Sequence, residues 1–269
     1  MTRTLARRAR LGALLFLALV PGLALAQRTI AFEPYAVPTN GAVAVPVRKG
    51  APLEGAYAEV DRATNGALQR AVAAAAWRGD RGSTLSLPGI GPYAHVLLVG
   101  TGDEAPGQRL LEDVGGLVAQ AGLNSPASRI DVLWPDTATP AAGAHLAFGA
   151  SLGQYRFKRY RTPKPDAPKT GEGTLVFRVA DAAAASRAWT GDRLALADSI
   201  AFARDLITEP ANVIYPESFV ARTRDAFKGV PNVTIEVLDE AAMEKLGMRS
   251  ILAVGMGSER PPRLLIVRY

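Results

Sequence analysis

The sequence predicts an α/β fold, because short apolar runs that suit buried strands alternate with longer segments of helical periodicity. His95–Gly100 (HVLLVG) is a continuous apolar run, which is typical of a strand covered on both faces. Gln108–Ala121 follows it, with apolar residues three or four positions apart along one helical face. Hydrophobic residues make up 48% of the chain and charged residues 21%, the balance of a globular protein with a substantial core.

Further predicted elements continue this alternation over residues 27–185. Strands are predicted at Gly41–Val47, Ile130–Trp134 and Thr174–Val179, and helices at Tyr57–Ala76 and Ala141–Leu152. Gly122 is expected just past the end of the preceding helix, where a left-handed conformation ends a helix at low cost. We expect these residues to form one domain, with a mixed or parallel sheet between helical layers.

A second α/β unit is predicted over residues 186–269. The alanine-rich stretch Asp181–Thr190 marks the boundary, and a long helix at Asp192–Ile207 follows it. Pro216 suits the first position of the next helix. The remaining predictions are a strand at Val233–Leu238, a helix capped by Asp239 and ending at Gly247, and strands at Ile251–Gly255 and Leu264–Val267.

Residues 1–26 are predicted to be a cleavable secretory signal. A basic start precedes the apolar run Leu11–Leu23, and Ala24 and Ala26 supply the small side chains that a signal peptidase requires, so Gln27 would begin the mature chain. A membrane anchor is the alternative, but the run is short for a hydrocarbon core of roughly 30 Å and a proline interrupts it. We therefore expect a periplasmic or secreted protein without a stable membrane anchor.

Charge and composition exclude several classes of function. The net charge is +6, but four arginines lie in residues 1–26, so the rest of the chain is nearly neutral and lacks the basic footprint of a nucleic-acid-binding protein. The absence of cysteine excludes disulfides, thiolate metal sites and cysteine nucleophiles. Both histidines, His95 and His145, lie in apolar surroundings and are interpreted as structural.

Two acidic residues share the spacing of a pair of metal ligands. Asp205 and Glu209 are four positions apart, on one face of a helix. We favour a solvated helix face over a metal site, because no histidine lies nearby and Arg204 offers an ion pair.

Three segments have the composition of a binding site. Gly100-Thr101-Gly102 follows an apolar strand, as the glycines of a phosphate loop do. The third glycine of a dinucleotide-binding motif is missing at Glu104-Ala105, so we favour a strand-end turn. The glycines of Gly255–Ser258 are an equally weak indication of a phosphate loop. Tyr155–Lys164 mixes aromatic and basic residues and could bind nucleic acid in isolation. We favour a helix end that packs its aromatic side chains inward and displays its charges.

Local strings from residue 192 onward resemble the leucyl aminopeptidase (M17 metallopeptidase) family at the start of its catalytic domain. They are Ala203–Leu206 (ARDL), Glu209–Asn212 (EPAN), Pro216–Phe219 (PESF), Val237–Glu240 (VLDE), Lys245–Met248 (KLGM), Ala253–Ser258 (AVGMGS) and Arg260–Leu264 (RPPRL). Upstream, Gly153–Tyr160 and Leu97–Gly102 are similar to segments of the family's N-terminal domain. One departure is Tyr215, where family members often have a threonine that caps the helix.

The resemblance implies a fold and an activity. It implies a macro-like N-terminal layer sandwich, with a central sheet between helices, followed by an α/β catalytic domain that is incomplete here. In the family two divalent metals, commonly Zn²⁺ or Mn²⁺, polarise the scissile carbonyl and activate a water, which releases N-terminal amino acids from peptides. Family members are commonly hexamers, so a homo-oligomer is possible.

The family's metal-binding strings, a Gly-rich Lys…Asp segment and Asn-Thr-Asp-Ala-Glu-Gly-Arg, do not occur in this sequence. No catalytic, cofactor-binding or metal-binding residue is therefore assigned. The leading hypothesis is the front part of an exported leucyl aminopeptidase-like protein that is inactive as this chain alone. A non-catalytic binding or assembly module built on the N-terminal domain and a catalytically dead but assembled homologue remain alternatives.

Overall fold

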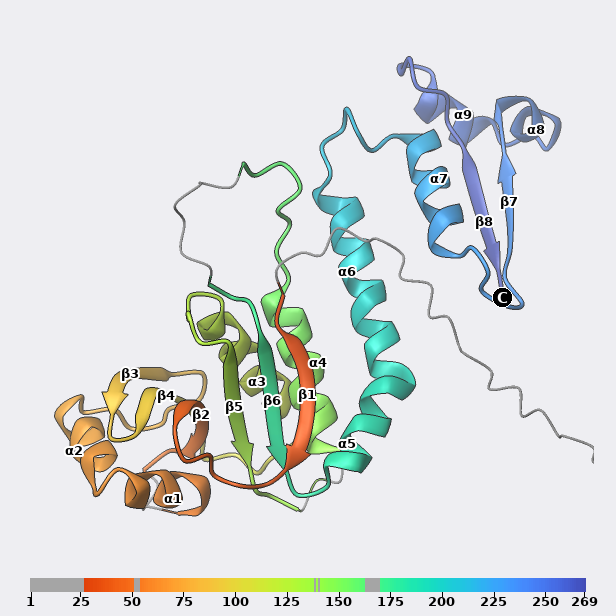
Figure 1. The fold of residues 1–269 in the computed structure, drawn as a ribbon. Coiled ribbons are helices and arrows are strands. Elements are labelled where there is room, and N and C mark those ends of the chain that lie inside the picture. The colour runs from red at the N-terminus through yellow and green to blue at the C-terminus, as the bar shows by residue number, and fades with distance from the viewer. Residues whose placement is uncertain (1–26, 51–53, 138, 140, 163–169) are drawn as a thin grey trace, which may run out of the picture.

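A six-stranded, mostly parallel sheet forms the centre of the first part of the protein. The computed structural model describes residues 27–50, 54–137, 139, 141–162 and 170–269. The strands are β1 (Thr29–Pro34), β2 (Gly41–Arg48), β3 (Thr84–Ile90), β4 (Tyr93–Gly102), β5 (Arg129–Trp134) and β6 (Thr174–Val179). Their order is β1-β6-β5-β2-β4-β3, and only β3 is antiparallel to its neighbour (Figure 1). The predicted α/β fold is confirmed.

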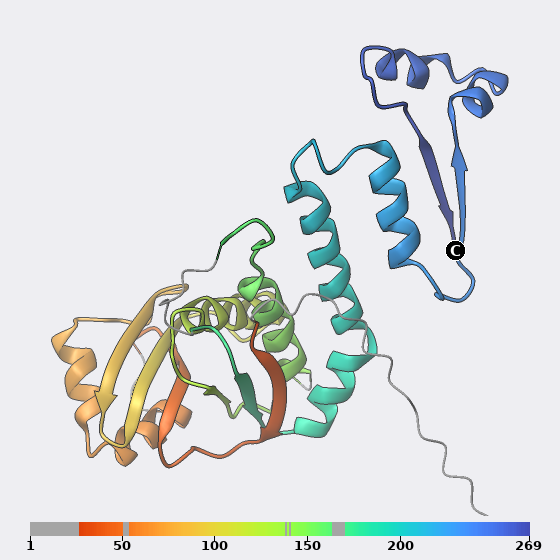
Figure 2. The same ribbon diagram turned by 45° about the horizontal axis from the view of Figure 1, so that its top comes forward.

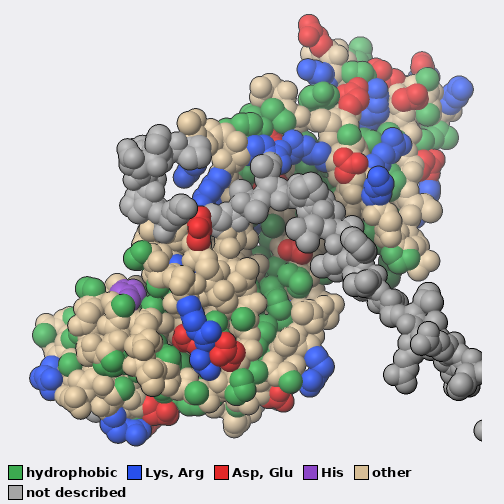
Figure 3. All heavy atoms as spheres, in the orientation of Figure 1, with side chains coloured by type: hydrophobic (Ala, Val, Ile, Leu, Met, Phe, Trp, Pro, Cys, Tyr) green, Lys and Arg blue, Asp and Glu red, His purple; other side chains and the backbone are tan. Residues whose placement is uncertain are grey.

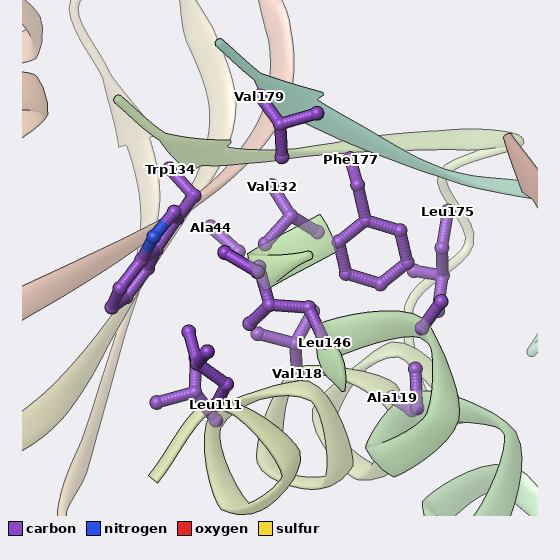
Figure 4. Close-up of a cluster of buried hydrophobic side chains, with 14 of the residues drawn as sticks. Ala44, Leu111, Val118, Ala119, Val132, Trp134, Leu146, Leu175, Phe177 and Val179 are labelled. Atoms are coloured by element: carbon purple, nitrogen blue, oxygen red, sulfur yellow. The ribbon is translucent and has the colours of Figure 1, made fainter. Parts of the chain in front are cut away.

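Helices cover both faces of this sheet. The helices on one face are α3 (Gln108–Gly122), α4 (Ala142–Gln154) and α5 (Ala182–Ala188). There Val132 and Phe177 of the strands meet Leu111 and Leu146 of α3 and α4 (Figure 4). The other face is covered over β2 and β4 by α1 (Gly55–Ala63) and α2 (Ala67–Ala74). Because successive side chains of a strand point to opposite faces, β2 and β4, which helices cover on both faces, are apolar over most of their length.

Helices α3 and α4 pack with their backbones in direct contact. A Cβ atom on Gly115 would lie 1.9 Å from the carbonyl oxygen of Leu146, and one on Gly149 would lie 1.9 Å from that of Glu112. Only glycine permits this approach.

The connections reverse direction at β2. The chain passes from β2 to α1 on one face, whereas β4 and β5, which flank β2, lead to α3 and α4 on the other. In open α/β sheets such a reversal leaves a crevice at the carboxyl ends of the strands, where ligands bind.

The second part of the chain leads away from the sheet (Figure 2). Its elements are η1 (Trp189–Arg193), α6 (Leu194–Thr208), α7 (Pro216–Ala226), β7 (Thr234–Leu238), α8 (Glu240–Lys245), α9 (Arg249–Gly255) and β8 (Leu264–Arg268), with β7 and β8 antiparallel. Ala185, Trp189 and Ala197 are buried in the first core, so that core extends past residue 185; the domain division itself stays a prediction. Within the described ranges no helix is both long and apolar enough to cross a membrane.

Three predicted features differ in the structure, and two strands had not been predicted. The helix predicted at 57–76 is divided, because Asn65 and Gly66 adopt positive φ angles of 52° and 75°. Gly122 is the last residue of α3 without a left-handed conformation; a Cβ there would lie 3.2 Å from Ile130 Cδ1. The strand predicted at 251–255 is helix α9, an ambiguity inherent in short apolar runs. β1 and β3 were not predicted.

Candidate functional site

The two predicted carboxylates do not lie on a solvated helix face. Asp205 accepts a hydrogen bond of 2.7 Å from the Tyr155 hydroxyl. The Glu209 side chain, just past the end of α6, is fully buried and contacts Arg159, the Tyr160 hydroxyl and, at 2.9 Å, Arg222 of α7. The solvated-face interpretation is wrong for Glu209, because tertiary contacts enclose it, whereas Asp205 is half-buried and bonded to Tyr155.

The surroundings of Glu209 keep it ionised. Burial alone would raise its pKa, but hydrogen bonds from Tyr160 and Arg222 and the charge of Arg159 outweigh burial, so the pKa lies below its ordinary value. One carboxylate thereby joins the segment after α4, the end of α6 and helix α7.

The predicted ion-pair partner, Arg204, is occupied elsewhere. Its guanidinium donates to the carbonyl oxygen of Leu152 at 3.0 Å and lies 5.3 Å from the centre of the Tyr155 ring. It therefore fixes the long helix to the end of α4.

The aromatic and basic segment from Tyr155 is not a helix end. Helix α4 ends at Gln154, and the described residues that follow are irregular up to residue 162; Pro163 and Lys164 lie outside the described residues. Tyr160 is 56% exposed while its hydroxyl reaches Glu209, and Arg159 is used in the same cluster. The segment holds two parts of the protein together and does not display all its charges.

His145 is structural, as predicted. Its Nε2 lies 3.2 Å from the Arg193 guanidinium and its Nδ1 lies 3.1 Å from Glu112 Oε1. Because a guanidinium only donates, Nε2 accepts and Nδ1 carries the proton toward Glu112.

His95 does contact a hydroxyl group, which the sequence had not indicated. Its Nε2 lies 2.7 Å from Ser86 Oγ across the β3–β4 hairpin, and burial lowers its pKa. In the described part of the chain no carboxylate hydrogen-bonds its Nδ1, so the pair lacks the group that orients the base in a catalytic triad.

The glycine motif at residues 100–102 forms the last residues of strand β4, which pair with β2, and the turn follows at residue 103, so the predicted strand-end turn begins just after the motif. The Gly100 amide donates to Ser83 O at 2.8 Å and the Gly102 amide donates to Gly79 O at 3.1 Å, so neither is available to a phosphate. Gly255–Ser258 is the end of α9, where the Ser258 amide donates to Gly255 O.

A charged network lies on the sheet face over β1, β6 and β5 (Figure 3). Arg129 contacts both Glu33 and Asp131, and Arg178 donates to Asp131 at 2.8 Å and to Glu33 at 2.9 Å. Burial would raise the pKa of Asp131, but the two arginines lower it below its ordinary value. Every charge here has a partner, which indicates a structural role.

No metal centre is built by the residues that the structure describes. Among them, no three His, Asp or Glu side chains come close enough to hold a metal ion. The side chains present therefore do not fit the two-metal centre that the resemblance implies.

A cavity of about 310 Å³ lies at the reversal point of the sheet. The carboxyl ends of β2, β4 and β5 surround it with the first turn of α1, and Tyr57, Leu133 and Trp134 are buried residues of its wall. The sequence had not indicated this cavity, because its lining comes from several strands and one helix start that only the fold brings together.

The fold and these sites define an α/β protein in which a six-stranded sheet with its helices is followed by a long helix and a two-stranded sheet. Family models assign both parts. "Cytosol aminopeptidase family, N-terminal domain" matches residues 44–164, and "Cytosol aminopeptidase family, catalytic domain" matches residues 201–269. The chain belongs to the cytosol aminopeptidase (M17) family, which confirms the resemblance.

Curated relatives share this assignment. A probable cytosol aminopeptidase of Bradyrhizobium sp. is 38% identical over 79% of this chain and 44% of its own length. One from Caulobacter vibrioides is 36% identical over 86% of this chain and 46% of its own. The chain thus spans less than half the length of these relatives.

Solved structures share the fold. A mutant of tomato leucine aminopeptidase superposes with a TM-score of 0.78 at 19% identity, over 91% of this chain and 51% of that one. The bottromycin maturation enzyme BotP in complex with Mn gives a TM-score of 0.63 at 26% identity, over 85% of this chain and 45% of that one.

Proposed function

We propose that this chain is the N-terminal portion of an exported leucyl aminopeptidase-like protein, whose family reaction is two-metal hydrolysis that releases N-terminal amino acids from peptides. The observation that carries the proposal is the family match over both parts of the chain. The metals, Zn²⁺ or Mn²⁺, belong to segments that this sequence does not contain, so the chain alone is inactive. A structural neighbour is titled as a complex with Mn.

The test of this function is hydrolysis of leucine p-nitroanilide by the purified chain with Mn²⁺ or Zn²⁺ added. We expect no hydrolysis above that of a mock preparation from cells lacking the gene, which controls for host peptidases. Metal-dependent hydrolysis that co-elutes with the chain overturns the claim of inactivity. Reading the DNA downstream of Tyr269 tests whether the chain is the front portion of a longer protein; absence of any Lys…Asp and Asp-Ala-Glu coding segments in frame refutes that part of the proposal.

Export is part of the same proposal, although the relatives are named cytosol aminopeptidases. Ala24 and Ala26 lie outside the described residues, and Gln27 lies two residues before the start of strand β1. Arg28 is buried and makes four side-chain hydrogen-bond contacts with the domain. Cleavage after Ala26 would therefore keep Arg28 and its contacts in the mature chain, which supports this cleavage site.

Expression in a Gram-negative host tests export. We expect a periplasmic product whose N-terminal sequence begins at Gln27, and an Ala26→Arg variant that stays unprocessed because the bulky side chain does not fit the peptidase. An Ala18→Val change within the apolar run is the matched control and should leave processing intact. A cytoplasmic product that retains residues 1–26 refutes the proposal.

A homo-oligomer is the remaining alternative use of the chain. The assembled but inactive homologue predicts a defined oligomer by light scattering, and a monomer counts against it. Peptides would be the substrates only of the complete protein.

A further inference from the structure

The second unit of the chain, residues 210–269, has few buried side chains that could fix its orientation. Its described residues bury only Val220 and Met243 among their hydrophobic side chains. Helix α7 lies beside the end of α6, and the strands and short helices that follow lie beyond α7 (Figures 1 and 2). The connection at residues 209–215 is irregular, and residues 210–212 are exposed. Because apolar burial contributes little here, polar contacts at the junction carry more weight.

One carboxylate at this junction receives donors from both sides. The side chain of Glu209 is fully buried and follows directly on the last residue of α6. Arg159 and the Tyr160 hydroxyl contact it from the segment after α4, and Arg222 of α7 contacts it at 2.9 Å. A carboxylate offers about four lone-pair sites, so it can accept from all three groups at once. The two arginines thus share a single buried counter-charge.

The donors come from two different family domains. Arg159 and Tyr160 lie within the residues matched by the N-terminal domain of the family, and Arg222 lies within the residues matched by its catalytic domain. The segment that carries the first two donors, residues 155–161, is called the strap below. Its first residue is fixed to α6, because the Tyr155 hydroxyl donates to Asp205 at 2.7 Å. The strap therefore presents its donors to Glu209 from a fixed position.

The other side-chain bonds of α7 tie it to its own unit. Glu217 pairs with Arg263, just before β8, at 3.0 Å. The Ser218 hydroxyl donates to the carbonyl oxygen of Val213 at 2.8 Å. These contacts connect α7 to the preceding loop and to the approach of β8. Arg222 is thus the residue of α7 whose side chain reaches back across the junction.

We propose that the cluster around Glu209 is a latch between the two family domains. The strap fixes the carboxylate, and the carboxylate fixes α7 through Arg222. When the bond to Arg222 opens, the second unit turns about residues 210–215, since hinges are a few loop residues that absorb the change in backbone angles. The latch is a property of this chain alone, so it stands or fails independently of the proposed aminopeptidase function.

Double electron–electron resonance between two spin labels measures the orientation of α7. The chain has no cysteine, so Gln120→Cys on α3 and Ala226→Cys on α7 provide the only labelled positions, and both are exposed. We expect one narrow distance distribution in the purified, doubly labelled chain. A broad distribution at this stage means that nothing holds α7 in place, and it overturns the proposal.

Changes on α7 test the latch from the side of the second unit. Arg222→Met removes a hydrogen bond between charged groups, which should raise the open population about tenfold or more and broaden the distribution. Arg224→Met is the matched control at an exposed position of the same helix and should leave the distribution narrow. Arg222→Lys keeps the charge and should recover a narrower distribution. An unchanged distribution in Arg222→Met, equal broadening by Arg224→Met, or no recovery in Arg222→Lys contradicts the latch.

Changes in the strap test the latch from the other side. Arg159→Met should broaden the distribution less than Arg222→Met does, because Tyr160 still donates to Glu209. Arg161→Met is the matched control at an exposed position of the strap and should have no effect. Circular dichroism verifies that each variant is folded. If Arg159→Met fails to fold, Tyr160→Phe removes only a hydroxyl group and carries the same test. A strap change that leaves α7 as narrowly placed as in the parent refutes the role of the strap.

Discussion

Arg28 is buried at the end of helix α3, where its guanidinium replaces the water that would otherwise solvate the last carbonyl groups. It donates to Gly122 O at 3.1 Å, to Ser125 O at 3.0 Å and to Ala127 O at 2.6 Å. The cation also complements the negative end of the helix dipole. An Arg28→Met change removes the guanidinium from three carbonyl oxygens at a position that is 3% exposed. Gly122 O and Ser125 O keep the backbone amides of Ser125 and Gly171 as donors, whereas Ala127 O loses its donor.

The expected loss of unfolding free energy is large. Hydrogen bonds to a charged group contribute about 1.5–3 kcal/mol each, and relief of the buried charge offsets part of their sum, so we expect a loss of about 3–5 kcal/mol. The thermal midpoint should fall by roughly 6–20 °C for a protein of this size. Urea unfolding followed by circular dichroism measures the loss at unchanged m-value.

Two further variants identify the cause of that loss. Arg28→Lys keeps the charge but cannot span three carbonyls, and should recover only part of the loss. Arg109→Met makes the same change at an exposed position of α3 and should stay within about 0.5 kcal/mol of the parent. A loss below about 1 kcal/mol for Arg28→Met would refute the reasoning, because it would mean that water solvates the carbonyl groups equally well.

The remaining predictions concern the helix contact and the buried carboxylate. Gly149→Ala places a methyl group 1.9 Å from Glu112 O, so α3 and α4 must separate at a cost of about 3 kcal/mol in unfolding free energy. Gly116→Ala is the control, because a Cβ there meets only an oxygen at 3.5 Å. In urea unfolding this control should be neutral or stabilising. Glu209→Gln should lower stability by about 1–3 kcal/mol at pH 7. The folded-state pKa of Glu209 is lowered, so its ionised carboxylate contributes fully to folding stability above the unfolded pKa of about 4.3, and this stability is lost as pH falls through the folded pKa. The melting curves of parent and variant should therefore converge in acid. A stability difference that stays constant with pH contradicts the role of the charge.

The elements that the sequence predicts best are those buried on both faces. β4, β5 and β6 are apolar over most of their length, so burial alone identifies them. β1 and β3 lie at the two edges of the sheet and alternate apolar with polar residues or contain proline. Edge strands of this kind carry a weak local signal, since their pairing depends on neighbours remote in sequence.

The sites show the same limit more sharply. Helical spacing correctly places Asp205 and Glu209 near one another at the end of α6, but it carries no information about what packs opposite. Arg222 reaches Glu209 from another helix, and Tyr155 reaches Asp205 from a loop some 50 positions earlier in the chain. The partners decide whether a carboxylate is a metal ligand, a solvated charge or a structural ion, and only the fold supplies them.

The two parts of the chain differ in how many hydrophobic side chains they bury. Both hydrophobic clusters of the first part are complete between residues 42 and 197, and the walls of the cavity belong to them. The described residues after 197 bury only Val220 and Met243 among their hydrophobic side chains. The first core thus gains little stability from the second unit. Arg28→Met acts on that core, whereas Glu209→Gln acts where the segment after α4, the end of α6 and helix α7 meet.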